Sequence, residues 1–418
     1  MAIATLSAFA LLLGDAALRV ALAAWLGLAL LALYDAAVSR QPLALTVEAP
    51  GDLFVGEAGR FRFDLPAAGT ALTGRTAWPD GLAGPALFDF APSADRMQAD
   101  LTVRAVRRGA WRCEALWVLR PSRLGLFEFI RKLPLDLVVR VVPNIRLVQS
   151  GQITATVLST LYGTKENRAI GDGSEFHQLR EFSPGMDIKS IDWKRSAKQR
   201  ALLAKELRAE RNHHVILAID NGYLMSEAIA GLPKIDHAIT AALATAWAAA
   251  IGGDLVGWFA YDASPRQFTK PEPGRQAFAR LRHWTADLAY AARETNHTLA
   301  MSALKARTPK RSLIIVFTDF VDATSAELLI ENLSVLNKRH LVLFVAIRDP
   351  DLERRLAASP PNLNAVAELV TADLMLRERR LVFERLNRIG VTVIDTKPAE
   401  ITAQVISRYL EIKARELI

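Results

Sequence analysis

The chain has 418 residues, a formal net charge of +8 and a pI near 9.7, and 51% of its residues are hydrophobic. This length predicts more than one domain. The basic balance suits a protein near anionic lipid or another polyanion, although a soluble basic surface would give the same total. Cys113 is the only cysteine, which excludes an intramolecular disulfide and a cysteine-rich zinc site.

The N-terminal segment, residues 1–34, is almost wholly apolar and carries only two charges, Asp15 and Arg19. A helix needs roughly 20 residues to cross the hydrocarbon core of a bilayer. Ala16–Tyr34 is long enough, whereas Met1–Leu13 is short. We predict a transmembrane hairpin over residues 1–34. One long tilted helix and a cleaved signal peptide are the alternatives, and the lack of Lys or Arg before Arg19 disfavours the signal peptide.

Residues 42–145 have a different pattern, in which short strand-like runs are separated by Gly and Pro clusters. Runs of this length and spacing are typical of a β-sandwich-like domain. No catalytic pattern stands out, so a spacer or docking module is expected. The predicted strands are Leu43–Val47, Arg60–Leu65, Met97–Val106, Trp111–Leu119 and Leu137–Val142.

Residues 146–211 are predicted to be a connector that leads into a charge-dense signature segment. Gly171–Trp193 is a loop that contains glycine and charges of both signs. Lys194–Arg211 is predicted to be a helix with a basic face, which could meet lipid phosphate, an acidic partner or solvent alone. Aromatic side chains do not interleave with these cations, so no nucleic acid is expected as a partner.

Residues 212–418 alternate between apolar strands and helices, which predicts an α/β domain with a doubly wound, mostly parallel sheet. Near-continuous apolar strands indicate burial on both faces. The predicted strands are His214–Ile219, Asp254–Tyr261, an antiparallel edge strand at Arg266–Lys270, Ser312–Thr318, Leu341–Ile347 and Val391–Ile394. The predicted helices are Ile235–Ile251, Gly274–Ala291, Ala323–Lys338, Leu363–Arg388 and Ile401–Leu417.

The stretch from Gly171 to Lys194 reads GDGSEFHQLREFSPGMDIKSIDWK. This pattern, G-x-G-x-E-F-x-x-L-R-E-F-x-P-G-x-D-I-x-x-I-D-W-K, resembles the hallmark of the domain-of-unknown-function fifty-eight family. The resemblance implies a membrane-anchored relative of von Willebrand factor A domains. It also implies a MoxR-type AAA+ ATPase as partner, because genes of this family often neighbour the genes of such ATPases.

Von Willebrand A domains hold Mg²⁺ with a D-x-S-x-S loop, a Thr from a second loop and an Asp from a third. The resemblance places Asp220, Thr298 and Asp319 in these three loops. Gly222 and Leu224 replace the two serines and offer no side-chain oxygen. We therefore expect a degraded site, no bound cofactor and at most weak Mg²⁺ binding. The alternative is that the two aspartates only cap helix N-termini.

The signature segment carries many charges within twenty residues, and these charges cannot all be buried without pairing. We expect Arg180 and Lys194 to pair with some of the acids, which would fix an irregular loop against the sheet domain, and the charges that stay exposed to meet a partner. The predicted partner-binding residues are Glu175, Arg180, Asp187, Asp192 and Lys194. The predicted apolar anchors are Phe176, Phe182 and Trp193.

The sequence thus favours a non-enzymatic interaction protein of the inner (cytoplasmic) membrane that contacts lipid through residues 1–34. Arg40 favours soluble domains that face the cytoplasm. The ATPase implied by the resemblance would supply energy for a chaperone-like or assembly role, which fits the lack of a nucleotide-binding motif. The alternative is a metal-dependent hydrolase or nuclease that uses Asp192, Asp220 and Asp319.

Overall fold

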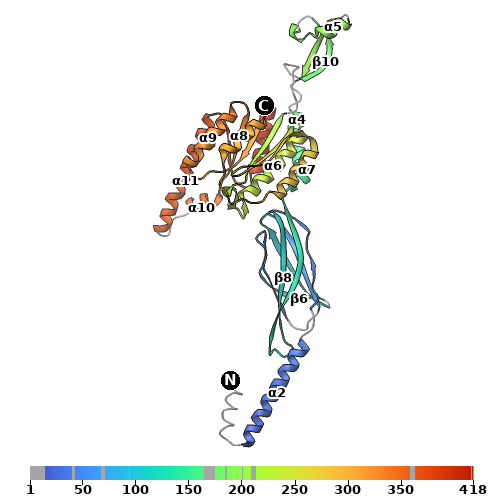
Figure 1. Ribbon diagram of the computed structural model, residues 1–418, viewed down its shortest axis with the longest axis vertical. Coiled ribbons are helices and arrows are strands. Elements are labelled where there is room, and N and C mark those ends of the chain that lie inside the picture. The colour runs from blue at the N-terminus through green and yellow to red at the C-terminus, as the bar shows by residue number, and fades with distance from the viewer. Residues whose placement is uncertain are drawn as a thin grey trace. The chain divides into compact units, whose positions relative to one another are not determined.

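The computed structural model (Figure 1) describes residues 15–39, 43–66, 71–93, 95–163, 175–183, 186–199, 201–208, 213–357, 363–415 and 417. The chain divides into two compact units, Met1–Val142 and Pro143–Ile418. Each unit has its own sheet and core, and each is described by itself.

The first unit begins with helix α2 (Asp15–Ser39). Within the described residues, this is the one helix long and apolar enough to cross a membrane, over Arg19–Ser39. The structure therefore has one such helix where the sequence predicted a hairpin. The predicted first arm, Met1–Leu13, lies outside the described residues. The helix has large side chains on all sides, such as Val20, Leu26 and Leu33, that are 66–70% exposed.

Nine strands follow α2 in the order β1-β3-β7-β6-β4-β8-β9-β2, with β5 paired to β7. Strand β6 changes partners along its length, because Leu87–Phe90 pairs with β4 and Ala91–Ser93 with β7. Alternate side chains point inward, and Phe61, Phe63 and Leu65 of β3 are at most 1% exposed. Their bounds are β1 Thr46–Glu48, β2 Asp52–Phe54, β3 Ala58–Pro66, β4 Leu72–Thr76, β5 Leu82–Ala83, β6 Leu87–Ser93, β7 Arg96–Ala105, β8 Gly109–Pro121 and β9 Glu128–Val142.

Cys113 lies on β8 in this core, and its side chain is buried. Burial raises the pKa of the thiol, because the charged thiolate would lose its hydration.

The second unit is built on a six-stranded sheet of order β16-β15-β12-β17-β18-β19. All neighbouring strands run parallel except the edge pair β15–β16. The mixed α/β architecture and the antiparallel edge strand confirm the prediction for this part of the chain. The strands are β12 His214–Asp220, β15 Leu255–Tyr261, β16 Pro265–Pro273, β17 Leu313–Phe317, β18 Leu341–Ile347 and β19 Thr392–Thr396.

Helices cover both faces of this sheet (Figure 1). One face packs against α8, α9 and α11, and the core there includes Phe259, Phe344 and Leu329. Helix α6 lies on the other face with α7 and α12 beside it. Burial on both faces explains why strands such as LIIVF need apolar side chains at every position. The bounds are α6 Lys234–Ile251, α7 Gly274–Asp287, α8 His297–Arg307, α9 Ala323–Asn337, α10 Pro350–Ala357, α11 Leu363–Arg388 and α12 Ile401–Ala414.

The predicted helix at Lys194–Arg211 is wrong. Helix α5 (Trp193–Gln199) is short, and strand β11 (Leu203–Arg208) follows and pairs antiparallel with β10 (Glu175–Glu181). The Ser196 hydroxyl accepts a hydrogen bond from Leu203 N at 2.9 Å, so the chain turns back on itself after α5. We call residues 175–208 the signature module.

Residues 146–163 form two helices, α3 (Arg146–Gln149) and α4 (Gln152–Gly163), where the sequence predicted only a connector. Helix α4 packs on α6. Val157 is fully buried, and Trp247 of α6 donates a hydrogen bond to the Thr154 hydroxyl. This helix is therefore part of the α/β unit's core.

We expect Val157→Ala to lower the free energy of unfolding by about 2 kcal/mol, because two methyl groups leave a packed site. Leu158→Ala is the matched control, since Leu158 is the next residue of α4 and is 38% exposed. Leu158→Ala should lower the free energy of unfolding by much less than Val157→Ala does. Thermal unfolding of the detergent-solubilised chain measures both, and equal costs would mean that α4 does not pack as described.

Candidate functional site

Ligands of parallel α/β sheets bind at the carboxyl ends of the strands, so a functional site is expected at this edge of the sheet. Three carboxylates lie there. Asp220 ends β12, Asp319 follows β17 and Asp395 lies near the end of β19. Asp220 and Asp319 are buried at 1% and 3% exposure. We call this group the strand-edge site.

Asp220 receives hydrogen bonds on both carboxylate oxygens. The Thr295 hydroxyl donates to Oδ1 at 2.6 Å, the Gly222 backbone N–H to Oδ1 at 2.8 Å, and the Thr318 hydroxyl to Oδ2 at 2.5 Å. Burial raises the pKa of Asp220, and these donors and the nearby His297 oppose that shift. Protein donors therefore already occupy both oxygens that a metal would use.

Gly222 makes this arrangement possible. A Cβ atom at residue 222 would lie 1.9 Å from the Thr295 hydroxyl oxygen, which is far inside contact distance. Its backbone has ordinary dihedral angles (φ −72°, ψ 175°), so glycine is needed for space and not for backbone freedom. Thr295 thus brings a hydroxyl to Asp220 from another loop, close to where a side chain at residue 222 would lie.

The predicted second-loop threonine lies elsewhere. Thr298 is exposed on α8, and its hydroxyl accepts a hydrogen bond from Asn332 of α9 at 3.0 Å. The residues that contact Asp220 are instead Thr295 and Thr318. Thr318 precedes Asp319 and could have been found from that motif. Thr295 gives no local signal, because it is 75 residues from Asp220 in sequence.

Three buried polar atoms of residues close to Asp220 have no hydrogen-bond partner among the described residues: Asn221 Oδ1, Tyr261 Oη and His297 Nδ1. Burial lowers the pKa of His297, and the Asp220 charge partly opposes this. Unsatisfied buried groups of this kind are the usual setting for ordered water. A bound water molecule is the simplest occupant that these groups fit.

Asp319 lies between two cations. Lys234 Nζ is 2.7 Å from Oδ2, and an Arg379 guanidinium nitrogen is 2.7 Å from Oδ1. Lys234 also pairs with Glu227 at 2.5 Å, and Arg379 with Asp395 at 3.2 Å.

Asp395 in turn pairs with Arg348 at 2.9 Å, which completes a run of three carboxylates and three cations. We call these six residues the ion-pair chain: Glu227, Lys234, Asp319, Arg379, Asp395 and Arg348.

Arg379 is supplied by α11, and its guanidinium lies near two aromatic rings. Its central carbon lies 5.5 Å from the Phe320 ring centre and 5.1 Å from that of Phe383. Burial lowers the pKa of this guanidinium, but the Asp319 and Asp395 charges outweigh burial and raise it. The two nearby rings and the paired carboxylates together favour one position of the guanidinium.

Burial alone would raise the pKa of Asp319, but the charges of Arg379 and Lys234 outweigh burial and hold it below its ordinary value. Asp319 is therefore ionised and already neutralised by the protein's own cations. A dication here would face an ammonium and a guanidinium, so the residues present do not fit Mg²⁺. Nor do the described residues contain any group of three or more His, Cys, Asp or Glu side chains placed to hold a metal.

The predicted partner-binding residues all lie in the signature module. Arg180 and Lys194 are exposed, on β10 and α5. Asp187 is also exposed, and its side chain accepts a hydrogen bond from Lys189 N, which caps a short 3₁₀ turn, η2 (Ile188–Ser190). Glu175 lies on β10, and its side chain is outside the described part of the molecule.

Asp192 is the most constrained of the set. Its side chain accepts from Arg195 N at 3.1 Å and lies 3.6 Å from Lys205 Nζ of β11. The Arg195 hydrogen bond, with Lys205, lowers the pKa of this carboxyl. Trp193 is 65% exposed, so its predicted role as an apolar anchor is wrong.

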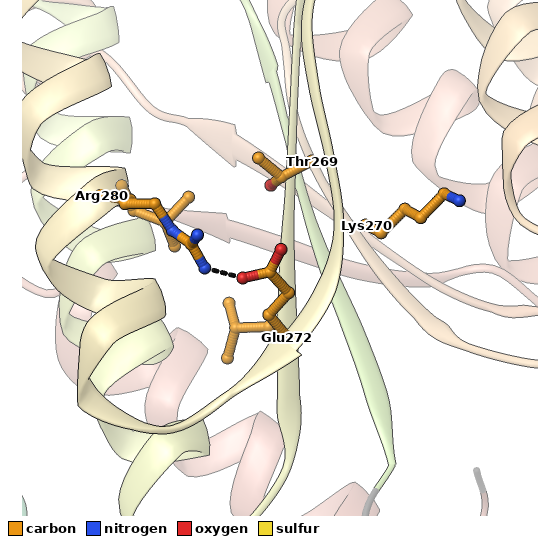
Figure 2. Close-up of a pocket in the computed structure, with 6 residues that line it drawn as sticks. Thr269, Lys270, Glu272 and Arg280 are labelled. Carbon is orange, nitrogen blue, oxygen red and sulfur yellow. Dashed lines mark ion pairs between the residues drawn. The ribbon is translucent and has the colours of Figure 1, made fainter.

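Two hollows among the described residues are candidate ligand sites. The one between β16 and α7 is bounded by Thr269, Lys270, Glu272 and Arg280, with an ion pair between the last two (Figure 2). Its volume of about 10 Å³ suits one water molecule. The other is a depression of about 400 Å³ beside Arg60 of β3 in the first unit. Neither lies at the strand-edge site.

A family model described as "Protein of unknown function DUF58" matches residues 178–388, which is half of the chain. Two curated relatives are named Uncharacterized protein Mb1516, from Mycobacterium bovis, and Uncharacterized protein Rv1480, from Mycobacterium tuberculosis. Each is 24% identical over 192 residues, which is 46% of this chain. The match spans 60% of the length of those relatives.

Two solved structures are also similar. One is the conserved hypothetical protein BatB from Bacteroides thetaiotaomicron, with 14% identity and a TM-score of 0.31 over 49% of this chain and 100% of that chain. The other is an aerotolerance-related membrane protein from Bacteroides fragilis, with 14% identity and a TM-score of 0.30 over 48% of this chain and 99% of that chain. Scores of this size carry no argument about function.

We expect Asp319→Asn to cost about 3–5 kcal/mol of stability, because it leaves Lys234 and Arg379 buried without their shared counter-charge. Asp373→Asn on α11 is the matched control. Asp373 pairs with Arg377 at the surface, and such pairs contribute about 0–1 kcal/mol. Chemical denaturation in detergent measures both, and similar costs would contradict the central role of Asp319.

The same carboxyl also predicts a pH dependence. Because the folded pKa of Asp319 is depressed, its contribution is complete above the unfolded value of about 3.9 and is lost as pH falls through the lower folded value. The melting temperature of the unmodified chain should therefore fall more than that of Asp319→Asn between pH 5 and pH 3.

We expect Gly222→Ser to destabilise the chain by about 1–3 kcal/mol, because its Cβ would collide with the Thr295 hydroxyl. Thr295→Ala removes that hydroxyl together with its hydrogen bond to Asp220, so it is the background for a double-mutant cycle. The cost of Gly222→Ser should be smaller in the Thr295→Ala background than in the unmodified chain. The next contacts of the new Cβ, with Asp220 and the Arg293 carbonyl, are at 3.1 and 3.2 Å. An equal cost of Gly222→Ser in both backgrounds would refute the steric explanation.

Proposed function

Since the chain belongs to the DUF58 family of proteins of unknown function, we propose from its own structure that it is a membrane-anchored, non-enzymatic interaction protein. The α/β unit would present a binding surface to a protein partner, and α2 would hold the chain at the membrane. The proposal rests on the state of the strand-edge site and on the exposure of α2.

The strand-edge site supports a binding role over a catalytic one. A hydrolase or nuclease of this architecture needs carboxylates that are free to hold a metal or move a proton. Here Asp319 is paired with two cations, and Asp220 accepts three hydrogen bonds from neutral donors. Asp192, the third candidate, is engaged in the signature module. No observation therefore favours the metal-dependent enzyme.

Helix α2 supports membrane anchoring because the protein does not cover it. Only 6% of its candidate membrane span is buried, and large apolar side chains face outward around it. Such a helix in water would expose much apolar surface, whereas a bilayer would cover it. In this proposal α2 anchors the chain in the inner membrane, and both units face the cytoplasm.

The partner is proposed to be a MoxR-type AAA+ ATPase, as the resemblance implies, and the α/β unit to be a von Willebrand A-like domain. The order of five parallel strands with one antiparallel edge strand is compatible with that fold. A partner ATPase would provide the energy for a chaperone-like or assembly role. In this picture the strand edge is a rigid support and not a metal-dependent docking point.

The contact surface is proposed to lie on the signature module. It presents Trp193 and Ile188 at 65% and 68% exposure, beside the exposed charges of Arg180 and Lys194. Exposed tryptophan is enriched in energetic centres of protein interfaces, and a rim of charges gives specificity. Asp192 would instead hold the module together, because its side chain is committed to Arg195 N and Lys205.

We expect Trp193→Ala and Lys194→Ala each to weaken capture of the MoxR-type ATPase from the same cell at least tenfold without lowering the melting temperature. Leu328→Ala, at another exposed leucine (60%) on α9, is the matched control and should change neither quantity. Purified ATPase and detergent-solubilised chain in a titration give the dissociation constant. Undiminished binding by both variants would refute this surface, and no binding by the unmodified chain would refute the partner.

A further inference from the structure

The long hairpin of the first unit ends in a rigid turn. Strands β8 and β9 pair from Gly109 and Val141 to Pro121 and Glu128. Ser122 N then donates to the Phe127 carbonyl at 2.8 Å, and Phe127 N donates to the Ser122 hydroxyl at 3.0 Å. Gly125 takes the positive φ of 73° that the turn needs. We call residues 120–132 the hairpin tip.

The hairpin tip is tied to the last turns of α2. Arg123 N donates to the Ser39 hydroxyl at 3.2 Å, and Leu124 N donates to Asp35 Oδ1 at 3.0 Å. Asp35 and Ser39 are 1% and 4% exposed, so the tip covers both. These contacts lie within the first unit and fix the tip at the end of the apolar span, which runs from Arg19 to Ser39.

Large apolar side chains nevertheless point outward from the hairpin tip. Leu124, Leu126, Phe127 and Ile130 are 53%, 45%, 40% and 72% exposed. Single exposed apolar residues are normal. Four within seven positions form an apolar patch, and such patches mark contacts with another protein or with a membrane. Leucine and phenylalanine beside basic residues are the composition of segments that lie in the headgroup layer of a bilayer.

The charged side chains of the hairpin tip are mostly cations, which suits contact with anionic lipid headgroups. Arg120, Arg123, Arg131 and Lys132 stand against one acid, Glu128. Burial and the like charges of Arg123 and Arg131 lower the pKa of Arg120. The Nε atom of Arg120 is buried and has no acceptor among the described residues. Arg120 itself is only 5% exposed, so an anion outside the chain would reach the exposed Arg123 and Lys132 and would reduce the repulsion among the cations of the tip.

We propose that the hairpin tip is a second membrane contact, with Leu124, Leu126, Phe127 and Ile130 in the headgroup layer and its basic side chains on anionic phospholipid phosphates. The proposal rests on the proposed anchoring of α2. The bilayer is the occupant that the structure favours, because the tip is hydrogen-bonded to the end of the span itself. The contact would fix where the first unit meets the membrane surface.

The test is a depth measurement on the full chain in vesicles that contain about one-third phosphatidylglycerol. A single cysteine at Ile130→Cys carries an environment-sensitive fluorophore, and lipid-borne bromine or nitroxide quenches it from the bilayer. Val138→Cys is the matched control. Val138 is exposed on the same strand, roughly 26 Å further from the tip at about 3.3 Å per residue. Native Cys113 is buried, so the unmodified chain serves as the labelling blank.

We expect quenching at Ile130→Cys to exceed that at Val138→Cys at least threefold. Arg123→Gln with Lys132→Gln should reduce it about twofold or more, while Arg140→Gln, an exposed position on β9 paired to Asp52, should not. Equal quenching at residues 130 and 138 would overturn the proposal, and protection of Ile130 by a bound protein instead of lipid would do the same.

Anchoring is measured separately by alkaline carbonate extraction of the same vesicles. If the chain resists extraction and Ile130→Cys is unquenched, the tip contact fails and the anchor stands. If carbonate releases the chain, the anchor fails, and the tip proposal that rests on it fails as well.

Discussion

The arrangement of the α/β unit depends on the placement of one buried carboxylate, Asp319, between Lys234 and Arg379. Lys234 begins α6, Asp319 follows the central strand β17, and Arg379 projects from α11, so the ion pairs join elements from both faces of the sheet at its carboxyl edge. Buried ion pairs contribute little net stability, because desolvation offsets most of the attraction. We infer that their main effect is to fix which helix meets which strand end.

This constraint also decides what the edge can do. An open parallel sheet concentrates helix N-termini and loop amides at its strand ends, which makes that edge the usual place for a ligand. In this chain the same place is filled by side chains from within, with Thr295 and Thr318 on Asp220 and the cations on Asp319. The protein's own side chains therefore occupy the position that a metal at this edge would need.

The sequence predicted most of the α/β unit, because burial on both faces forces each strand to be continuously apolar and each helix to end at a Gly or polar break. It failed where the decisive contacts are between distant segments. Leu203–Arg208 is a strand because β10 pairs with it, and no local pattern distinguishes it from the end of a basic helix. Thr295 reaches Asp220 only because residue 222 lacks a Cβ. This contact depends on how distant loops meet in the folded chain, so the sequence around either residue does not predict it.

The signature module shows why a dense motif cannot be equated with a binding surface. Two of its acids, Asp187 and Asp192, are used to close a 3₁₀ turn and to begin α5, since each accepts a hydrogen bond from a backbone N–H two or three residues later. A carboxylate that already accepts a hydrogen bond within the module interacts less strongly with a partner protein. Arg180, Lys194 and Trp193 are exposed among the described side chains of the module, so the proposed contact would have the tryptophan as its apolar centre and these cations at its rim.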